Sequence, residues 1–395
     1  MAFDLPGGRP RVAFYNDPRV RSIAYQLVLF AAVAFLVYGA ASNAIDNLAR
    51  AHITSGFGFW NTTAGFDISQ TLISYSADAS TYGRAFWVGL LNTLLVAGLG
   101  ILFATVLGFI IGISRLSKNW LLAKAAGGYV ETIRNIPLLL QLLFWYNAVL
   151  KSLPIVRESY TFPGGIYLNN RGLILPEPVL QGDFDWVITA LAAGIVASIG
   201  FYLWARRRQM RTGQQSPVFW VSLALIVGLP VAVALLLGFP VQFNYPKAGR
   251  FNILGGVGVQ PEFLALLCGL SIYTGAFIAE VVRAGILAVS RGQIEAAYSL
   301  GLKPGPTLRL IVVPQAMRVI IPPLTSQYLN LTKNSTLAVA IGYPDLVQVF
   351  TGTVLNQTGQ AVTVVAITMA VYLTISLITS LAMNLYNRRV ALVER

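Results

Sequence analysis

The stretch FWVGLLNTLLVAGLGILFATVLGFIIGI, from Phe86 to Ile113, is long, apolar and free of charge. A transmembrane helix needs about 20 consecutive apolar residues to cross the hydrocarbon core of a bilayer. This stretch is longer than that, and it has neither the alternation of a half-buried strand nor the polar stripe of a surface helix. It therefore predicts a helix that spans a membrane.

The rest of the chain repeats this character. Only 11% of its 395 residues are charged and 56% are hydrophobic, whereas soluble domains contain about 25% charged residues. The sequence therefore predicts an all-α polytopic membrane protein with about eight transmembrane helices. The predicted spans are Ile23–Ala41, Phe86–Ile113, Leu121–Leu150, Trp186–Ala205, Val218–Phe239, Phe263–Val289, Leu324–Phe350 and Val362–Leu385.

Composition also excludes several classes of function. The net charge of +13 comes from basic residues between the apolar blocks rather than from a basic face, so nucleic-acid binding is not expected. The single cysteine, Cys268, and the single histidine, His52, form neither an internal disulfide nor the usual ligand set of a metal site. We therefore expect no metal and no cofactor on this chain, and no serine-hydrolase, HExxH or Cys–His catalytic set.

The distribution of Lys and Arg predicts the orientation. With the N-terminus in the cytoplasm, 18 basic residues lie inside and 7 outside, and cytoplasmic segments are the basic ones. We therefore expect both termini in the cytoplasm, and the first apolar block to be a retained helix rather than a signal peptide. The inside residues are Arg9, Arg11, Arg19, Arg21, Arg115, Lys118, Lys124, Arg206, Arg207, Arg208, Arg211, Arg291, Lys303, Arg309, Arg318, Arg388, Arg389 and Arg395. The outside residues are Arg50, Arg84, Lys151, Arg157, Arg171, Lys247 and Arg250.

The inside segment 290–323 is too apolar for a plain linker. Ser290 and Gln293 have the spacing of a capping box, and Gly301 stands where the C-terminal cap of a short helix is expected. A second helical stretch is predicted from Thr307, broken at Pro314 and again at Pro322-Pro323. Two short helices hinged at a glycine would dock on a cytoplasmic partner; an amphipathic loop on the membrane surface is the alternative.

This segment resembles the EAA loop of bacterial ATP-binding-cassette (ABC) importer permeases. Glu295-Ala296-Ala297, three residues, Gly301, nine residues and Ile311-Val312-Val313-Pro314 match the pattern, with Val313 at its usual leucine. In that family the loop inserts into a cleft of the ATPase. The resemblance therefore implies coupling-loop roles for Arg291, Gly292, Glu295, Ala296, Ala297, Gly301, Ile311 and Pro314.

Three neighbouring stretches resemble the polar-amino-acid branch of that family. They are VETIRNIPLLLQ from Val130 to Gln141, AEVVRAGI from Ala279 to Ile286, and KNSTL from Lys333 to Leu337. The resemblance covers residues 86–150 and 260–385 and implies a five-helix type I importer core, with an N-terminal helix and an inserted transmembrane hairpin added. The expected divisions are an N-terminal region at 1–85, a first core segment at 86–150, a loop and hairpin at 151–260, and a second core segment at 261–395 with its coupling loop at 290–323.

The resemblance also implies a function and a set of partners. We expect a non-enzymatic permease subunit of the bacterial inner membrane, closest to general L-amino-acid transporters, that carries polar amino acids over a broad range. The expected partners are a cytoplasmic ABC ATPase dimer that binds ATP and Mg, a second homologous permease subunit, a periplasmic amino-acid-binding protein and membrane lipid. This chain itself has no Walker motif.

Charged pairs inside the spans have two interpretations. Glu131 with Arg134, and Glu280 with Arg283, have i,i+3 spacing near the cytoplasmic ends of their helices. Each is either an ion pair that holds the bundle or a gate that exchanges partners during transport. Gln141, Asn147, Lys333, Asn334, Ser335 and Thr336 either line the substrate path or join helices by hydrogen bonds.

An ion-gradient-driven secondary transporter is the alternative function. It needs coupling carboxylates near the middle of the membrane, and the candidates are Glu131, Glu280 and Asp345. Glu131 and Glu280 each have an arginine three residues later as a partner, which argues against their role as coupling carboxylates.

Overall fold

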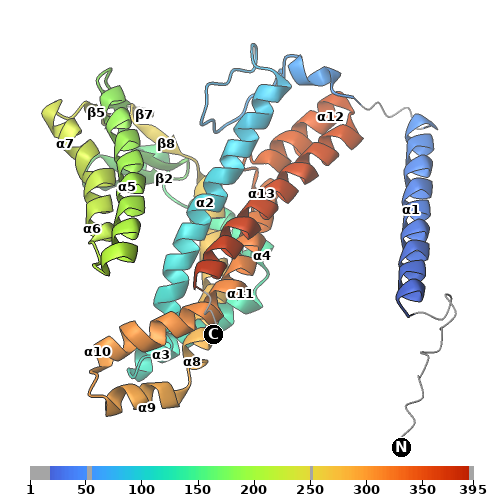
Figure 1. Ribbon diagram of the computed structural model, residues 1–395. Helices are drawn as coiled ribbons and strands as arrows, with labels where there is room; N and C mark the ends of the chain where they lie inside the picture. The colour runs from blue at the N-terminus through green and yellow to red at the C-terminus, as the bar shows by residue number, and fades with distance from the viewer. Residues whose placement is uncertain (1–17, 51–55, 250–251, 391–395) are drawn as a thin grey trace, which may run out of the picture.

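The computed structural model describes residues 18–50, 56–249 and 252–390 (Figure 1). His52, Arg9, Arg11, Arg250 and Arg395, which entered the predictions above, lie outside these residues. Within them, seven helices are long and apolar enough to cross a membrane, or eight if one bent helix pair is counted as a span. The prediction of a helical membrane protein is confirmed.

The bundle is built around α2 (Tyr82–Ser114) and α8 (Pro261–Leu287), which pack along their length. Glycines on α2 allow this close approach. A Cβ at Gly108 would lie 2.5 Å from the Ile278 side chain, and one at Gly112 would lie 2.7 Å from the Ala279 carbonyl oxygen. Small residues at such crossings let helix backbones approach closely in a membrane. Helix α11 (Val313–Asn334) packs against both helices of this pair, and α13 (Ala361–Val390) packs against α11.

The third predicted span is broken. Helix α3 (Trp120–Asn135) ends before Pro137, and the chain turns by 105° into α4 (Leu138–Leu143) and the π-helix η3 (Phe144–Leu150). Ile136 has extended backbone angles, as a residue before proline prefers. The predicted span from Leu121 to Leu150 is therefore present as a bent helix pair, with its break at this proline.

The seventh predicted span and the inside segment before it have different bounds from those expected. Helix α9 (Arg291–Ser299) is followed by one apolar helical stretch of 38 residues, Pro304–Ile341. It comprises α10 (Pro304–Thr307), η6 (Leu308–Val312), α11 and η7 (Ser335–Ile341), and it ends at Gly342, whose φ is +77°. The predicted breaks at Pro314 and Pro322-Pro323 are wrong, because Pro314 lies in the first turn of α11 and the pair lies inside it.

After Gly342 a separate helical segment leads to α13. It consists of η8 (Val347–Val354) and α12 (Leu355–Thr358), so Phe350 belongs to this segment and not to the seventh span. Asp345 lies at its start and is fully buried. The Asp345 Oδ1 atom accepts a hydrogen bond from the Gln348 amide at 2.8 Å, and Oδ2 accepts one from the Tyr372 hydroxyl at 3.3 Å. This carboxylate therefore caps a helix start and joins it to α13.

The parts of the predicted loop-and-hairpin region that flank the hairpin contain antiparallel strands. The strands are β1 (Tyr160–Phe162), β2 (Ile166–Asn169), β3 (Gly172–Leu175), β4 (Glu177–Leu180), β5 (Val241–Asn244), β6 (Lys247–Ala248), β7 (Ile253–Leu254) and β8 (Val257–Val259). They pair in the orders β1-β2-β3-β8, β4-β5 and β6-β7. We call this end of the bundle the sheet face and the opposite end, where α9 lies, the α9 face (Figure 1).

The segment before α2 also folds at the sheet face. It contains η2 (Gly58–Asn61), and the Tyr75 hydroxyl donates a hydrogen bond to the Phe66 carbonyl at 2.8 Å. Burial, followed by the nearby Asp67 carboxylate, raises the pKa of Tyr75 to about 12, so this donor keeps its proton. A second short helix at this face, η4 (Val156–Glu158), precedes β1.

The predicted hairpin is present between β4 and β5. It consists of α5 (Phe184–Thr212) and a second helix made of α6 (Val218–Leu223), η5 (Ala224–Gly228) and α7 (Leu229–Leu236). The hairpin packs on itself, and in Figure 1 it lies beside the bundle, as α1 (Pro18–Arg50) does on the other side. Most of the surface of the hairpin is exposed, which is the pattern of helices that face lipid.

Candidate functional site

Helix α9 is a short helix held outside the bundle by a glycine cap. Gly301 has a φ of +78°, the left-handed conformation that glycine adopts without a steric penalty. The Gly301 amide donates to the Tyr298 carbonyl at 2.9 Å, and the Leu302 amide donates to the Ala297 carbonyl at 3.1 Å. This pair of bonds is the Schellman motif. The chain therefore reverses sharply between α9 and the stretch that begins at Pro304.

One face of α9 packs inward and the other is exposed. Ala297 is 3% exposed, whereas Leu300 is 83% exposed, and Glu295 and Ala296 lie on the outer side. Arg291 and Gly292 form the exposed first turn. Leu300 follows the last turn of α9, at the opposite end from Arg291.

The predicted capping box does not form. Ser290 stands at the N-cap, but its hydroxyl makes no cap bond, and the Gln293 amide donates instead to the Ser290 backbone carbonyl at 3.1 Å. Ile311 and Pro314 lie on the long helical stretch rather than on a second short helix.

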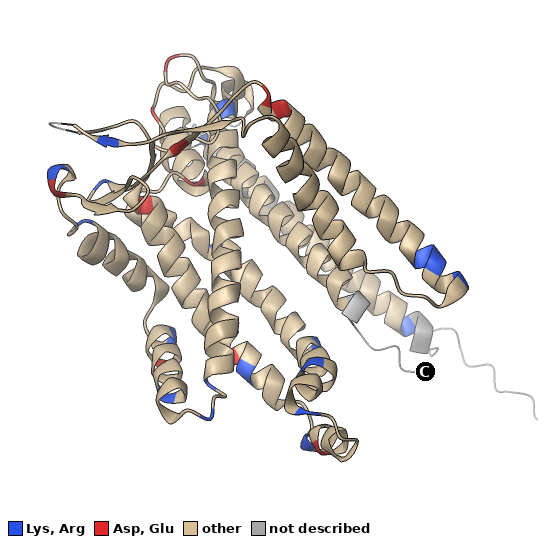
Figure 2. Cartoon of the chain, turned by 90° about the vertical axis from the view of Figure 1, so that its left-hand side faces the viewer, with Lys and Arg blue, Asp and Glu red and all other residues tan. Residues whose placement is uncertain are grey.

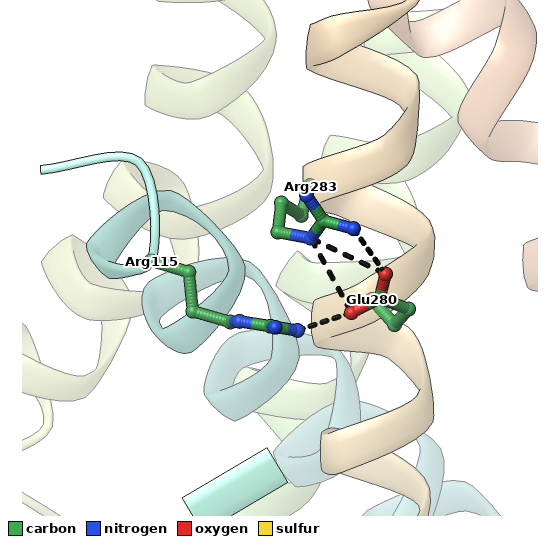
Figure 3. Close-up of polar contacts among 3 residues, drawn as sticks. All are labelled: Arg115, Glu280 and Arg283. Carbon is green, nitrogen blue, oxygen red and sulfur yellow. Dashed lines mark hydrogen bonds and ion pairs between the residues drawn. The ribbon is translucent and has the colours of Figure 1, made fainter. Parts of the chain in front are cut away.

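A cluster of three charges joins α2 to α8 near the α9 face (Figure 3). Arg283 Nη2 donates to Glu280 Oε1 at 2.6 Å, which is the predicted i,i+3 pair. Arg115, at the end of α2, also donates to Glu280 through Oε2. All three side chains are less than one-third exposed. The carboxylate is therefore shared by two arginines from different helices.

The other predicted pair is absent. Glu131 and Arg134 form no ion pair in the part of the chain that the structure describes, and both are exposed. The Arg134 guanidinium lies instead over the Phe277 ring of α8, 5.0 Å from its centroid. Glu131 and Arg134 have the spacing of one helix face, but the Arg134 cation contacts an aromatic ring on the neighbouring helix instead.

Gln141 has a different geometry from that of a substrate ligand. It is buried, and its Nε2 atom donates to the carbonyl oxygens of Ile133 at 2.8 Å and Ile136 at 3.0 Å. These carbonyls belong to the end of α3, which has lost its helical donors at Pro137. Gln141 therefore bridges the break between α3 and α4.

Most of the other predicted path residues also bond to their own helices. Asn147, Ser335 and Thr336 donate to the carbonyls of Leu143 (3.1 Å), Thr332 (2.8 Å) and Lys333 (2.8 Å), respectively. These bonds lie within one helical segment, so they are not the bonds between helices that were the alternative interpretation. A role for these residues in the path stays a prediction.

Lys333 is exposed within the span Pro304–Ile341 and forms no ion pair with an acid of the described residues. A charged side chain within a membrane span is costly, and such residues face a bundle interior or a water-filled cavity. Its surface is therefore unsuited to lipid.

A polar pocket of about 250 Å³ lies between α8 and α11. Asn334 is the only predicted path residue in its wall. Sequence spacing alone does not show which faces of two helices meet, so the remaining lining residues were missed. The lining residues are Tyr273, Thr274, Phe277, Gln327, Asn330 and Asn334.

Comparison with known proteins identifies the family. The profile of the family described as "Binding-protein-dependent transport system inner membrane component" matches residues 207–392. The "General L-amino acid transport system permease protein AapQ" of Rhizobium johnstonii is 55% identical over 385 residues, covering 98% of this chain and 96% of that protein. This chain belongs to the amino-acid ABC transporter permeases.

Two other relatives span the permease over nearly its full length. The "Putative amino-acid ABC transporter permease protein YhdX" of Escherichia coli is 51% identical and covers 96% of this chain and 97% of its own. The "Glutamate/glutamine/aspartate/asparagine transport system permease protein BztB" of Rhodobacter capsulatus is 44% identical, with complete coverage of both chains. The permease is therefore a non-enzymatic, multi-pass protein of the inner membrane. The secondary-transporter alternative finds no support in these relatives.

Proposed function

We propose that this permease is one of two membrane subunits of an importer for polar L-amino acids, and that a cytoplasmic ATPase drives it through α9. The substrate class is supported by the names of the relatives, which include a general L-amino-acid permease and one for glutamate, glutamine, aspartate and asparagine. ATP and Mg bind to the ATPase partner, and a periplasmic binding protein delivers the substrate.

The observation that carries the proposal is the geometry of α9. Its inner face packs through Ala297, its outer face presents Glu295, Ala296 and Leu300, and the Gly301 cap fixes its angle to the next helix. A short rigid helix of this kind suits insertion into a groove on a soluble partner. Displacement of α9 is passed directly to α8, which ends at Leu287, and to the stretch that starts at Pro304.

The orientation follows from charge. Figure 2 shows Lys and Arg gathered at the ends of the helices on the α9 face, while Asp and Glu are more frequent at the sheet face. Because basic segments remain in the cytoplasm, the α9 face is cytoplasmic, and so are both termini. The sheet face is then the periplasmic side, where the binding protein docks.

The path is proposed to run past Lys333 and the polar pocket. Lys333 needs a surrounding other than lipid, and a facing second permease subunit supplies one across a shared path. Asparagine and glutamine side chains in the pocket offer both donors and acceptors to a zwitterionic amino acid. The lysine ammonium offers a partner for the substrate carboxylate.

Cross-linking from neighbouring positions on α9 tests the proposal. In the purified, cysteine-free importer, Ala296→Cys is expected to cross-link to the ATPase, because this side chain lies on the exposed face. Ala297→Cys is the matched control and is expected to react little, because that position is 3% exposed. Cross-linking of Ala296→Cys only to a periplasmic protein would refute the orientation. Equal reaction at both positions would refute the docking geometry.

A further inference from the structure

The free end of the inserted hairpin carries a concentrated positive charge. Arg206, Arg207, Arg208 and Arg211 lie in the last turns of α5, and all are exposed. No acidic residue occurs in the sequence between Asp185 and Glu262. Neither of the ion pairs of the described residues involves these arginines. Figure 2 shows this basic tip without red beside it.

The length of α5 places this cluster at the level of lipid headgroups. A helix of 29 residues is about 43 Å long at 1.5 Å per residue, whereas the hydrocarbon core is about 30 Å thick. The first turn of α5 begins at the sheet, beside Asp183 and Asp185, so its last turns extend beyond the hydrocarbon. The arginines therefore lie where phosphate groups are found.

Aromatic residues mark the same level. Trp204, Phe219 and Trp220 are 51%, 69% and 68% exposed, and aromatic belts of this kind stand at the boundary between hydrocarbon and headgroups. The Arg208 guanidinium lies 5.4 Å from the centroid of the Trp204 ring, and its Nη2 atom donates to Gln214 Oε1 at 3.0 Å. These contacts hold Arg208 close to the membrane plane.

Lipid is the neighbour that surrounds the hairpin. In the most apolar windows of its two helices 17% and 6% of residues are buried, compared with 61% in α8. The hairpin lies beside the bundle in Figure 1 and joins it through the paired strands β4 and β5. Its free end is thus open to headgroups from several sides.

We propose that the arginine cluster at the tip of α5 is a binding site for anionic phospholipid headgroups, which anchors the inserted hairpin. Guanidinium groups bind phosphate oxygens through two parallel hydrogen bonds, and a cluster of four raises the preference for anionic over zwitterionic lipid. This assignment goes beyond the proposed function, and it holds for either orientation of the chain. The Gly213 cap, with a φ of +71°, and the polar turn 213–217 keep the two helix ends together at this level.

Counting retained lipids tests the site in the purified importer. The complex is exchanged into detergent with equal amounts of phosphatidylglycerol and phosphatidylcholine, and bound lipids are counted by native mass spectrometry. We expect the wild type to retain phosphatidylglycerol preferentially. Removal of two charges by R206Q/R207Q is expected to lower that preference at least about fivefold. Free glycerol phosphate at the same concentration is expected not to displace the lipid.

Two variants make the result specific. K118Q/K124Q removes two exposed charges elsewhere on the chain and is expected to retain phosphatidylglycerol like the wild type. R206K/R207K/R208K/R211K keeps the positive charge that orients the helix in the membrane. This variant is expected to retain most of the preference for phosphatidylglycerol. Unchanged retention in R206Q/R207Q, or an equal loss in K118Q/K124Q, would overturn the proposal. Loss of the ATPase from R206Q/R207Q would show that the cluster contacts a protein instead.

Discussion

Neutralising Arg115 tests whether the shared carboxylate joins α2 to α8. Arg115→Gln removes one charge-assisted hydrogen bond to Glu280, a type of bond that contributes about 1.5–3 kcal/mol. The side chains are 16% and 27% exposed, so solvent screening lowers the expected coupling to about 1–2 kcal/mol. Arg283 remains paired with Glu280 in this variant.

A double-mutant cycle isolates this coupling. Arg115→Gln, Glu280→Gln and the double variant are unfolded in mixed micelles, and the coupling free energy is taken from the departure from additivity. Lys118→Gln combined with Glu280→Gln is the control; it is expected to be additive, because Lys118 is exposed and forms no ion pair in the part of the chain that is described. A coupling energy for Arg115 and Glu280 below about 0.5 kcal/mol would refute the interpretation of Figure 3 as a joint between the two helices.

Three further substitutions test the other elements. Gly301→Asp strains a left-handed position by about 1 kcal/mol, and its carboxylate opposes the helix dipole. We therefore expect the permease to be present in the membrane at the normal level but to lose the ATPase on purification. Gly301→Asn is expected to retain the ATPase. Wild-type uptake by the Asp variant would contradict this role for α9. Gln141→Leu leaves two carbonyls at the end of α3 without their donor and is expected to lower the mixed-micelle unfolding free energy by about 1–3 kcal/mol; unchanged stability would mean that the bridge is absent. Lys333→Gln is expected to reduce uptake in proteoliposomes at least about tenfold with the complex intact, while Lys333→Arg retains it. Full uptake by the Gln variant would place the path elsewhere.

The sequence predicted those elements that are specified by residues close together in the chain. The apolar run from Phe86 predicts α2 because burial in a bilayer requires only length and composition. Gly301 predicts the end of α9 because a left-handed cap is specified by one residue and its neighbours. Glu280 and Arg283 form their pair because they are one turn apart on the same helix.

Some of the relations that were missed join residues far apart in the chain, and others depend on a local break in a helix. Arg115 reaches Glu280 across 165 positions, and the spacing within α8 carries no information about α2. The function of Gln141 depends on the break at Pro137, which turns the end of α3 toward it. The pairing of β3 with β8 was missed for the same reason as the Arg115–Glu280 contact, since the whole hairpin lies between these two strands in the sequence.

The two prolines inside α11 have a mechanical consequence. Neither Pro322 nor Pro323 has an amide hydrogen, so bending the helix here breaks fewer hydrogen bonds than bending it elsewhere. The helical stretch from Pro304 to Ile321 is about 27 Å long at 1.5 Å per residue, and it carries α9 at its far end. A rotation of about 10° at the prolines then moves Pro304 by about 5 Å, which is close to one helical turn. This stretch is thus a rigid arm that pivots at the proline pair and moves α9.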